Sequence, residues 1–361
     1  MTQSRYIPNV YPVLMSVSQP REQLIHCVMK IVSECPPGKP WTSKFKDQLQ
    51  GLWTGSTSIA YLFLWLAETH PNLSINDRLP IDWCHGYLDC GSDVLSSAQG
   101  LNGWGIKNEY LAYNTVKAAV TQDDRYVSKV IKAIKKDFDC PVVDNEHLSG
   151  RAASEQVEDC TSILVEQLVN AVPWKFHGHN YIGAAHGVIG ILTQIILSRP
   201  AMGRDAAIEY LISEQLDLQM DDGHWFITDD PNLGEPDLVH YCHGSPGFVI
   251  SLDAVCPFVS EVLKARICVA IERGRKEIWE KGILRKEPNL CHGIVGNMLA
   301  LQDWEQKEHF MAHATAQKIR KGIEHGGFVA GEDPYGLLWG EAGRAWGWAM
   351  IDKKLDMGYP S

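Results

Sequence analysis

One six-residue pattern, Cys-His-Gly-x-x-Gly, occurs twice in this 361-residue chain. The copies occupy residues 242–247 and 291–296, so they begin 49 positions apart. A third copy at residues 185–190 begins 57 positions earlier and has Ala185 in place of the cysteine. Cys and His are common zinc ligands, and Gly-x-x-Gly allows a close backbone approach before a helix. The pattern predicts loops that assemble a metal site from distant parts of the chain.

The spacing of these loops indicates a repeat. Each loop precedes an apolar helix, and amphipathic helices occur between them. Seven units follow when the chain is aligned on a loop glycine, at Gly55, Gly91, Gly150, Gly187, Gly244, Gly293 and Gly340. Such a period is typical of repeat architectures. Because the apolar helices need shielding from water, we expect an all-α fold, an α/α toroid with inner and outer rings of helices. An open helical solenoid is the alternative.

The toroid is expected to form a single domain over residues 1–361, with residues 1–20 as an extended arm that contains three prolines. Apolar residues at helical spacing predict the individual helices. The expected amphipathic helices cover residues 22–34, 125–138, 154–171 and 259–281, another begins at Asp205, and a more polar helix covers 306–322.

Composition excludes several classes of protein. The formal net charge is -11 and lysine and arginine form no long cluster, which argues against nucleic-acid binding. The sequence contains no run of about 18 apolar residues, so no transmembrane segment is expected. The first residues resemble no signal peptide, and Thr2 excludes N-myristoylation. Ten cysteines in such a chain suggest reduced thiols and a cytoplasmic location.

Three side chains are the predicted metal ligands: Cys242, Cys291 and His292. Two thiolates and one neutral imidazole neutralise Zn²⁺ and leave one of its four positions open, which is typical of a catalytic zinc. That position suits a substrate thiol, because a metal-bound thiol is deprotonated at neutral pH. The alternative is that these residues are buried and only pack. Cys84 precedes His85 and Gly86 but lacks the second glycine of the pattern, so it is not expected to bind metal.

Three further residues are candidates for proton transfer. His186 occupies the His position of the copy that lacks Cys and suits a general acid or base beside the metal; capping a loop is its alternative role. His243 adjoins Cys242 and is either catalytic or a residue that orients the ligand. Glu146, four residues before Gly150, is a weaker acid or base candidate, with a solvated surface carboxylate as the alternative.

The same motifs resemble those of the LanC-like proteins, the eukaryotic relatives of bacterial lanthionine cyclases. The resemblance rests on three segments: Gly183-Ala184-Ala185-His186-Gly187, Val239-His240-Tyr241-Cys242-His243-Gly244-Ser245-Pro246-Gly247 and Asn289-Leu290-Cys291-His292-Gly293. It implies a seven-fold α/α barrel with one zinc ion held by Cys242, Cys291 and His292.

The resemblance also implies an activity, the addition of a zinc-activated Cys thiol to a dehydroalanine or dehydrobutyrine to form a thioether. In the eukaryotic branch the thiol donor is glutathione. His186 is then the proton donor, and Lys286 and Arg5 are basic residues that contact glutathione. Phe328 occupies the position implied for a third basic residue.

Several functions remain open. The acceptor is a peptide or a small electrophile. A non-catalytic protein that binds zinc and a thiol, acting as an adaptor, is a second hypothesis. Hydrolysis by a metal-bound hydroxide is a third, and it ranks last because two thiolates make zinc a poorer Lewis acid.

Overall fold

The computed structural model describes residues 4–10, 14–38, 51–95, 105–136, 165–230, 238–329, 331 and 334–356. These residues form helices joined by loops with isolated β-bridges. The chain forms two compact units. The first contains residues 1–101, 107–127 and 283–361, the second contains residues 102–106 and 128–282, and the division falls within α5 (Asp124–Lys136).

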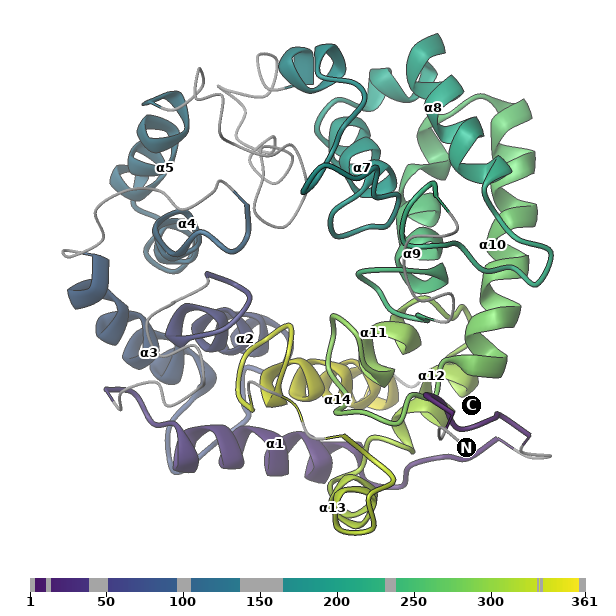
Figure 1. Ribbon diagram of the computed structural model, residues 1–361. Coiled ribbons are helices and arrows are strands. Elements are labelled where there is room, and N and C mark those ends of the chain that lie inside the picture. The colour runs from purple at the N-terminus through teal and green to yellow at the C-terminus, as the bar shows by residue number, and fades with distance from the viewer. Residues whose placement is uncertain are drawn as a thin grey trace. The chain divides into compact units, whose positions relative to one another are not determined.

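The first unit is built around two central helices, the apolar α2 (Ser56–Thr69) and the more polar α14 (Glu341–Asp356). Its other helices are α1 (Pro20–Glu34), α3 (Pro80–Leu95), α4 (Glu109–Thr121), α11 (Ile294–Leu299), α12 (Trp304–Met311) and α13 (Ala316–Glu324). Helix α14 packs against α1, α2, α11 and α12, while α2 also packs against α3 and α4. Figure 1 shows α14 and α11 side by side. Packing on several sides removes most of the apolar surface of a helix from contact with water. This burial is the main source of the stability of the packed helix.

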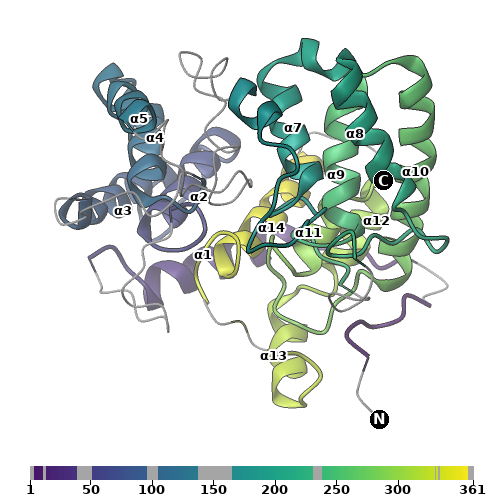
Figure 2. The ribbon, with the colours of Figure 1, turned by 45° about the horizontal axis from the view of Figure 1, so that its top comes forward.

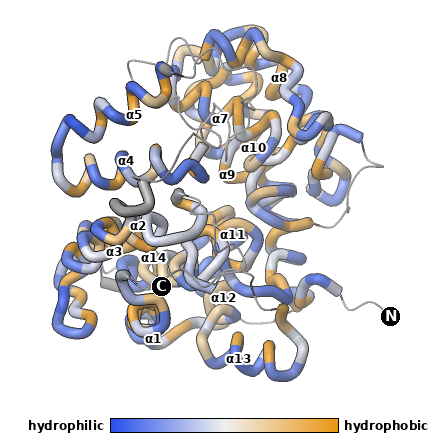
Figure 3. Tube along the Cα trace, turned by 60° about the vertical axis from the view of Figure 1, so that its left-hand side comes forward, coloured by the Kyte–Doolittle hydropathy of each residue, from blue (hydrophilic) through white to orange (hydrophobic). Residues whose placement is uncertain are grey.

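The second unit repeats this arrangement. Its helices are α7 (Val188–Ser198), the 3-10 helix η2 (Pro200–Arg204), α8 (Ala206–Asp217), α9 (Ser245–Val255), the 3-10 helix η3 (Cys256–Phe258) and α10 (Glu261–Lys281). Helix α9 packs between α7 and α10 (Figures 1 and 2). Hydrophobic and hydrophilic residues alternate along α8 (Figure 3). The apolar face of α8 therefore contacts α7 and α10 while the polar face remains in water.

The loop glycines stand immediately before the apolar helices, as predicted. Gly55, Gly187, Gly244 and Gly293 are the N-caps of α2, α7, α9 and α11, and Gly340 precedes α14. Gly244 has a φ of 103°, a conformation that side chains with a Cβ rarely adopt. Each of these loops thus ends at the first turn of a helix.

The second glycine of the pattern has a steric cause. A Cβ at Gly190, Gly247, Gly296 or Gly343 would collide with the carbonyl oxygen of the residue six positions earlier. For Gly247 that oxygen belongs to Tyr241, and for Gly296 it belongs to Leu290. The loop therefore folds back onto the first turn of its own helix, and this close approach fixes the residues between the two points, which include Cys242 and Cys291.

Two expectations from the sequence are wrong. Gly91 is not a loop glycine, because it lies inside α3. The next apolar helix, α4, follows a loop that contains Gly105, and the side chain of Asn108 caps it by accepting a hydrogen bond from Leu111 N–H. The polar helix expected at 306–322 is two helices, α12 and α13, because Thr315 caps a new start by accepting from Lys318 N–H. Gly150 lies outside the described residues.

The described part of the N-terminal arm, residues 4–10 and 14–19, is not helical, as predicted. Ile7 N–H donates to Ile283 O at 2.7 Å, and Tyr6 forms an antiparallel bridge with Leu284. No helix among the described residues is long and apolar enough to cross a membrane.

Candidate metal centre

Cys291 and His292 lie in the loop that leads into α11, and backbone hydrogen bonds fix both. Cys291 N–H donates to Leu338 O at 2.9 Å, and His292 N–H donates to the side-chain oxygen of Asn289 at 2.9 Å. Asn289 is buried, and its side-chain amide donates to Trp339 O at 3.2 Å. Cys291 is buried and His292 is half-buried. One asparagine therefore ties the loop of the two predicted ligands to the loop before α14.

The Trp339 ring lies beside His292 within the first unit. The ring centroids of His292 and Trp339 are 5.8 Å apart, and Trp53 meets Trp339 edge-on at 5.0 Å. The Lys107 ammonium lies 4.0 Å from the Trp53 ring centroid, within the range of a cation–π contact. A chain of contacts therefore runs from His292 through Trp339 and Trp53 to the Lys107 ammonium.

Cys242 lies in the corresponding loop before α9, in the second unit. Its carbonyl oxygen accepts a hydrogen bond from Ala185 N–H at 3.4 Å, and a Cβ on Gly183 would collide with that oxygen. His240 N–H donates to His243 O at 3.0 Å and closes the turn around Cys242. The third copy of the pattern, which lacks a cysteine, therefore packs directly against the copy that has one.

This packing brings His186 and His243 together. Their ring centroids are 5.7 Å apart, and Tyr181 lies 6.1 Å from His186 and 5.8 Å from His243. Phe176 stacks on His186 at 4.5 Å with an interplanar angle of 4°. A stacked imidazole has a defined ring plane, so the direction in which its nitrogens transfer a proton is fixed.

A buried carboxylate supports the start of α9. Glu277 of α10 accepts a hydrogen bond from the Ser245 hydroxyl, and Glu277 Oε1 lies 2.9 Å from His224 Nδ1. All three side chains are buried. Ser245 contacts the carboxylate rather than the imidazole and is fully buried, so this group stabilises the loop and does not resemble a hydrolytic triad. Glu277 was not predicted from the sequence, since nothing in the motif indicates a partner on the following helix.

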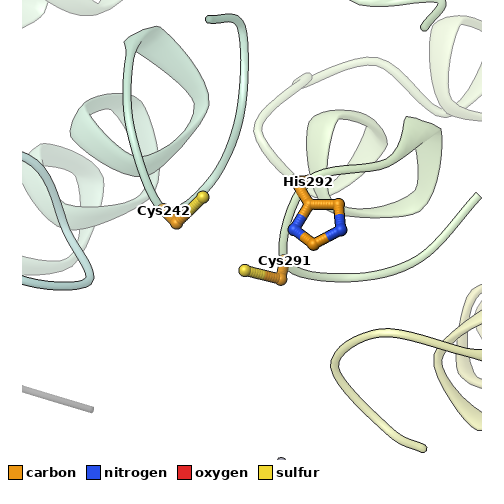
Figure 4. Close-up of side chains that lie close together, drawn as sticks. All are labelled: Cys242, Cys291 and His292. Atoms are coloured by element: carbon orange, nitrogen blue, oxygen red, sulfur yellow. The ribbon is translucent and has the colours of Figure 1, made fainter. Parts of the chain in front are cut away.

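The three predicted ligands form one group. One ligand atom each from Cys242, Cys291 and His292 lies within 4.8 Å of the other two (Figure 4). Tetrahedral zinc with Zn–S bonds of about 2.3 Å and Zn–N bonds of about 2.0 Å would hold these atoms about 3.5–3.8 Å apart. Two thiols and one imidazole are also the donor set that zinc prefers. The residues present therefore fit a zinc ion.

Other predicted residues fall outside this group. Glu146 lies outside the described residues. Cys84 is fully buried within α3, and burial raises the pKa of its thiol to about 12. Among the described residues it belongs to no cluster of metal-binding side chains. A thiol that resists ionisation is a poor metal ligand and a poor nucleophile.

The predicted basic residues Arg5 and Lys286 occupy neighbouring segments. Arg285 N–H donates to Arg5 O at 2.8 Å, and Lys286 pairs with Val329 in a parallel bridge. Arg285 thus joins the segments that carry Arg5 and Lys286, although the sequence analysis did not select it. Its position beside Lys286 was the available signal, since consecutive basic residues mark a local positive potential.

These observations define an all-α protein of the toroid class with a cluster of soft metal ligands at its Gly-x-x-Gly loops. The model of the family described as lanthionine synthetase C-like protein matches residues 47–355. The chain therefore belongs to the LanC-like family.

Individual relatives are more distant. Glutathione S-transferase LANCL1 of Danio rerio is 30% identical over 129 residues, which cover 34% of this chain and 30% of that protein. LanC-like protein GCL1 of Arabidopsis thaliana is 26% identical over 251 residues, 66% of this chain and 46% of that protein. The matches thus span less than half the length of either relative.

A solved structure confirms the fold class. Nisin cyclase aligns with 93% of this chain and 95% of its own, with a TM-score of 0.64 at 11% sequence identity. That identity supports the fold alone. The α/α toroid predicted from the repeat of glycine loops is therefore confirmed, and the open solenoid is excluded.

Proposed function

We propose that this chain is a zinc-dependent enzyme that forms a thioether by adding a thiol to an electrophilic double bond. The observation that carries the proposal is the group of Cys242, Cys291 and His292, whose ligand atoms lie within 4.8 Å of one another. Bound there, zinc would deprotonate a substrate thiol at neutral pH and thereby supply the nucleophile.

The protein's own residues account for the other half of the reaction. The thiolate sulfur bonds to the β-carbon of a dehydroamino acid, and the electron pair of the double bond moves to the α-carbon and its carbonyl. A proton-transfer group of the site accepts the proton that the thiol releases, and His186 donates a proton to the α-carbon, which completes the addition. The stacking of His186 on Phe176 supports this role because it fixes the ring plane. His243, 5.7 Å away between centroids, is the second proton-transfer group. Glu146 remains a weaker candidate.

The thiol donor we propose is glutathione. Glutathione carries two carboxylates, and basic side chains recognise carboxylates through charge-assisted hydrogen bonds. Arg5 and Lys286 supply two cations, and Arg285 extends the same segments. The name of one relative, glutathione S-transferase LANCL1, supports this donor.

The acceptor we propose is a dehydroalanine or dehydrobutyrine in a peptide. Nisin cyclase shares the fold, and its name describes a cyclase that acts on nisin. A small-molecule electrophile is the alternative acceptor.

The test is a mass-spectrometric assay with glutathione and a dehydroalanine peptide. The wild type should form the thioether faster than the uncatalysed background. His186→Asn should reduce kcat by about 10²–10⁴-fold, the usual contribution of a general acid, while it retains zinc. His179→Asn is the control, because His179 is exposed on the same unit. Wild-type rates equal to background would contradict the proposal.

One observation favours a second function, a non-catalytic adaptor that binds zinc and a thiol. Phe328 occupies the position expected for a third basic residue, and its ring lies against Gly322. An adaptor would bind zinc and glutathione without forming product. Glutathione binding with no thioether from either a peptide or a small acceptor would therefore favour the adaptor.

A further inference from the structure

A cavity in the second unit is not part of the proposed metal centre. Its volume is about 470 Å³, within the range of roughly 300–1,000 Å³ that is usual for ligand sites. Helices α7 and α8 and the segment before α7 form it. Its apolar lining includes Trp174, Ile182, Val188 and Leu211.

The polar atoms that line this cavity are mainly hydrogen-bond acceptors. Glu214 and Asp229 are exposed carboxylates on its rim, and Asp217 adds a third. Asn180 also lines it, and its amide group donates to Asp229 at 2.8 Å. That bond fixes the orientation of the Asn180 side chain, so its oxygen faces away from Asp229 as an acceptor.

Gln215 is the independent observation that points to a ligand. This residue is 5% exposed and lines the cavity. Within the described part of the chain, its side-chain oxygen is buried and has no hydrogen-bond partner, and the same holds for Asn180 Oδ1. A buried acceptor without a donor costs free energy, and a donor-rich group bound in the cavity would remove that cost once the Gln215 side chain turns its oxygen toward the cavity.

The cavity adjoins the loop that carries His186. Ile182 and Val188 stand on either side of His186, and both line the cavity. The backbone bonds Val188 N–H to Tyr181 O at 3.1 Å and Ile189 N–H to Ile182 O at 3.1 Å close this loop. A ligand in the cavity therefore contacts the two ends of the segment that positions the proposed proton donor.

From these features we infer that the cavity binds a lysine or arginine side chain of the peptide acceptor, near its dehydroamino acid. The cationic group faces Glu214 and Asp229 and donates hydrogen bonds to Gln215, while its apolar stem packs on Trp174 and Leu211. The inference rests on the proposed function, because it names the substrate class of the same site.

Peptide binding tests this inference without turnover. The probes are fluorescein-labelled dehydroalanine peptides that carry one arginine at one to four residues on either side, each paired with a glutamine version. Fluorescence anisotropy is measured in the absence of glutathione. At least one arginine peptide should bind about 3- to 10-fold more tightly than its glutamine partner, as expected for one or two exposed ion pairs with added hydrogen bonds.

The variant Glu214→Gln/Asp229→Asn should remove this preference. Both substitutions keep an oxygen for the existing donors, Tyr210 O–H and the Asn180 amide. Glu272→Gln, an exposed carboxylate on α10, is the control and should retain the preference. Equal binding of both members of every peptide pair, or a preference that survives in the double variant, would overturn the inference. Arginine amide binding as tightly as the peptide would also overturn it.

Gln215→Met separates a binding role from a structural one. The backbone carbonyl of Gln215 accepts from Trp225 Nε1 at 2.9 Å, and the substitution leaves that bond intact. Because the side-chain acceptor has no partner, the variant should be at least as stable as the wild type and should lose arginine preference. A variant that is less stable and keeps the preference would contradict the inference.

The outcomes also separate this inference from the proposed function. Thioether formation without arginine preference would overturn the inference and leave the enzyme proposal intact. Arginine preference without any thioether would support the cavity and overturn the enzyme proposal.

Discussion

Glu277 accepts a hydrogen bond from Ser245, although 32 positions separate them along the chain. Ser245 is the first residue of α9 and directly follows the Cys242-His243-Gly244 loop. The carboxylate thus holds the end of the loop that presents a proposed zinc ligand. In this way α10 helps to position the loop before α9, which carries Cys242.

Glu277→Ala should therefore weaken both the fold and the metal centre. The substitution removes the carboxylate shared by Ser245, His224 and Lys281, although the Ser245 hydroxyl keeps Gly223 O as an acceptor, and it should cost about 2–4 kcal/mol in the free energy of unfolding. Urea unfolding and zinc analysis are the measurements. Glu280→Ala, an exposed residue of the same helix, is the control. Equal stability and equal zinc content in the two variants would contradict the role of Glu277.

The second glycine of the motif makes a separate prediction. Gly247→Ala and Gly296→Ala should each lower the free energy of unfolding by about 1–3 kcal/mol, because the new Cβ collides with a loop carbonyl. Gly327→Ala is the matched control. A Cβ there meets only Gly322 O at 3.6 Å, an ordinary contact. Thermal unfolding measures the stability of the three variants. A Gly327→Ala variant that is no more stable than the other two would refute the steric explanation.

Acid should destabilise the first unit through His313. Burial first, and then the nearby Lys318, lower the pKa of His313 to about 3, whereas an unfolded histidine titrates near 6.5. Between about pH 6.5 and pH 3 the unfolded chain binds a proton that the folded chain does not. Stability contributed by neutral His313 is therefore present above the unfolded pKa and is lost as the pH falls through this window.

The neighbouring His309 acts in the same direction. Its pKa is lowered by burial and by Lys318. Its Nδ1 accepts from Met15 N–H at 2.9 Å, and its Nε2 lies 3.0 Å from Asn9 Oδ1. Accepting at Nδ1 requires the neutral imidazole, so protonation would loosen the N-terminal arm.

Unfolding free energies measured from pH 7 to pH 5 test this account. The wild type should lose stability as the pH falls, and His313→Leu should show a shallower slope. His179→Gln, an exposed site, should keep the wild-type slope. Identical slopes for the wild type and His313→Leu would show that His313 does not bind its proton differently in the two states.

Local sequence was sufficient to predict most of the glycine loops and the grouping of the three candidate ligands. Gly244 and Gly293 each stand directly before a run of apolar residues, and each is the N-cap of a helix. Cys242, Cys291 and His292 lie within two positions of one of these glycines. The error at Gly91 has a clear cause. Asp89-Cys90-Gly91 resembles the loop pattern, but the buried Trp83, Cys84, Tyr87 and Leu88 have helical spacing, and that periodicity continues the helix through Gly91.

Contacts between distant segments could not be predicted. Asn9 and His309 are 300 positions apart, and no local preference links them. The partnership of Glu277 with Ser245 and the approach of Arg5 to Arg285 depend on how helices pack, which a periodic pattern does not specify. The cavity at Gln215 is equally hidden, because its acceptors come from three separate segments.

The zinc content of the purified chain tests the central claim most directly. Elemental analysis should find about one zinc per chain in the wild type and in Cys84→Ala, since one three-ligand site holds one ion. Cys242→Ala and Cys291→Ala should each lose most of it, although Cys84 is as buried as they are. A wild-type chain that binds no zinc, or full zinc content in both ligand variants, would contradict a shared metal centre.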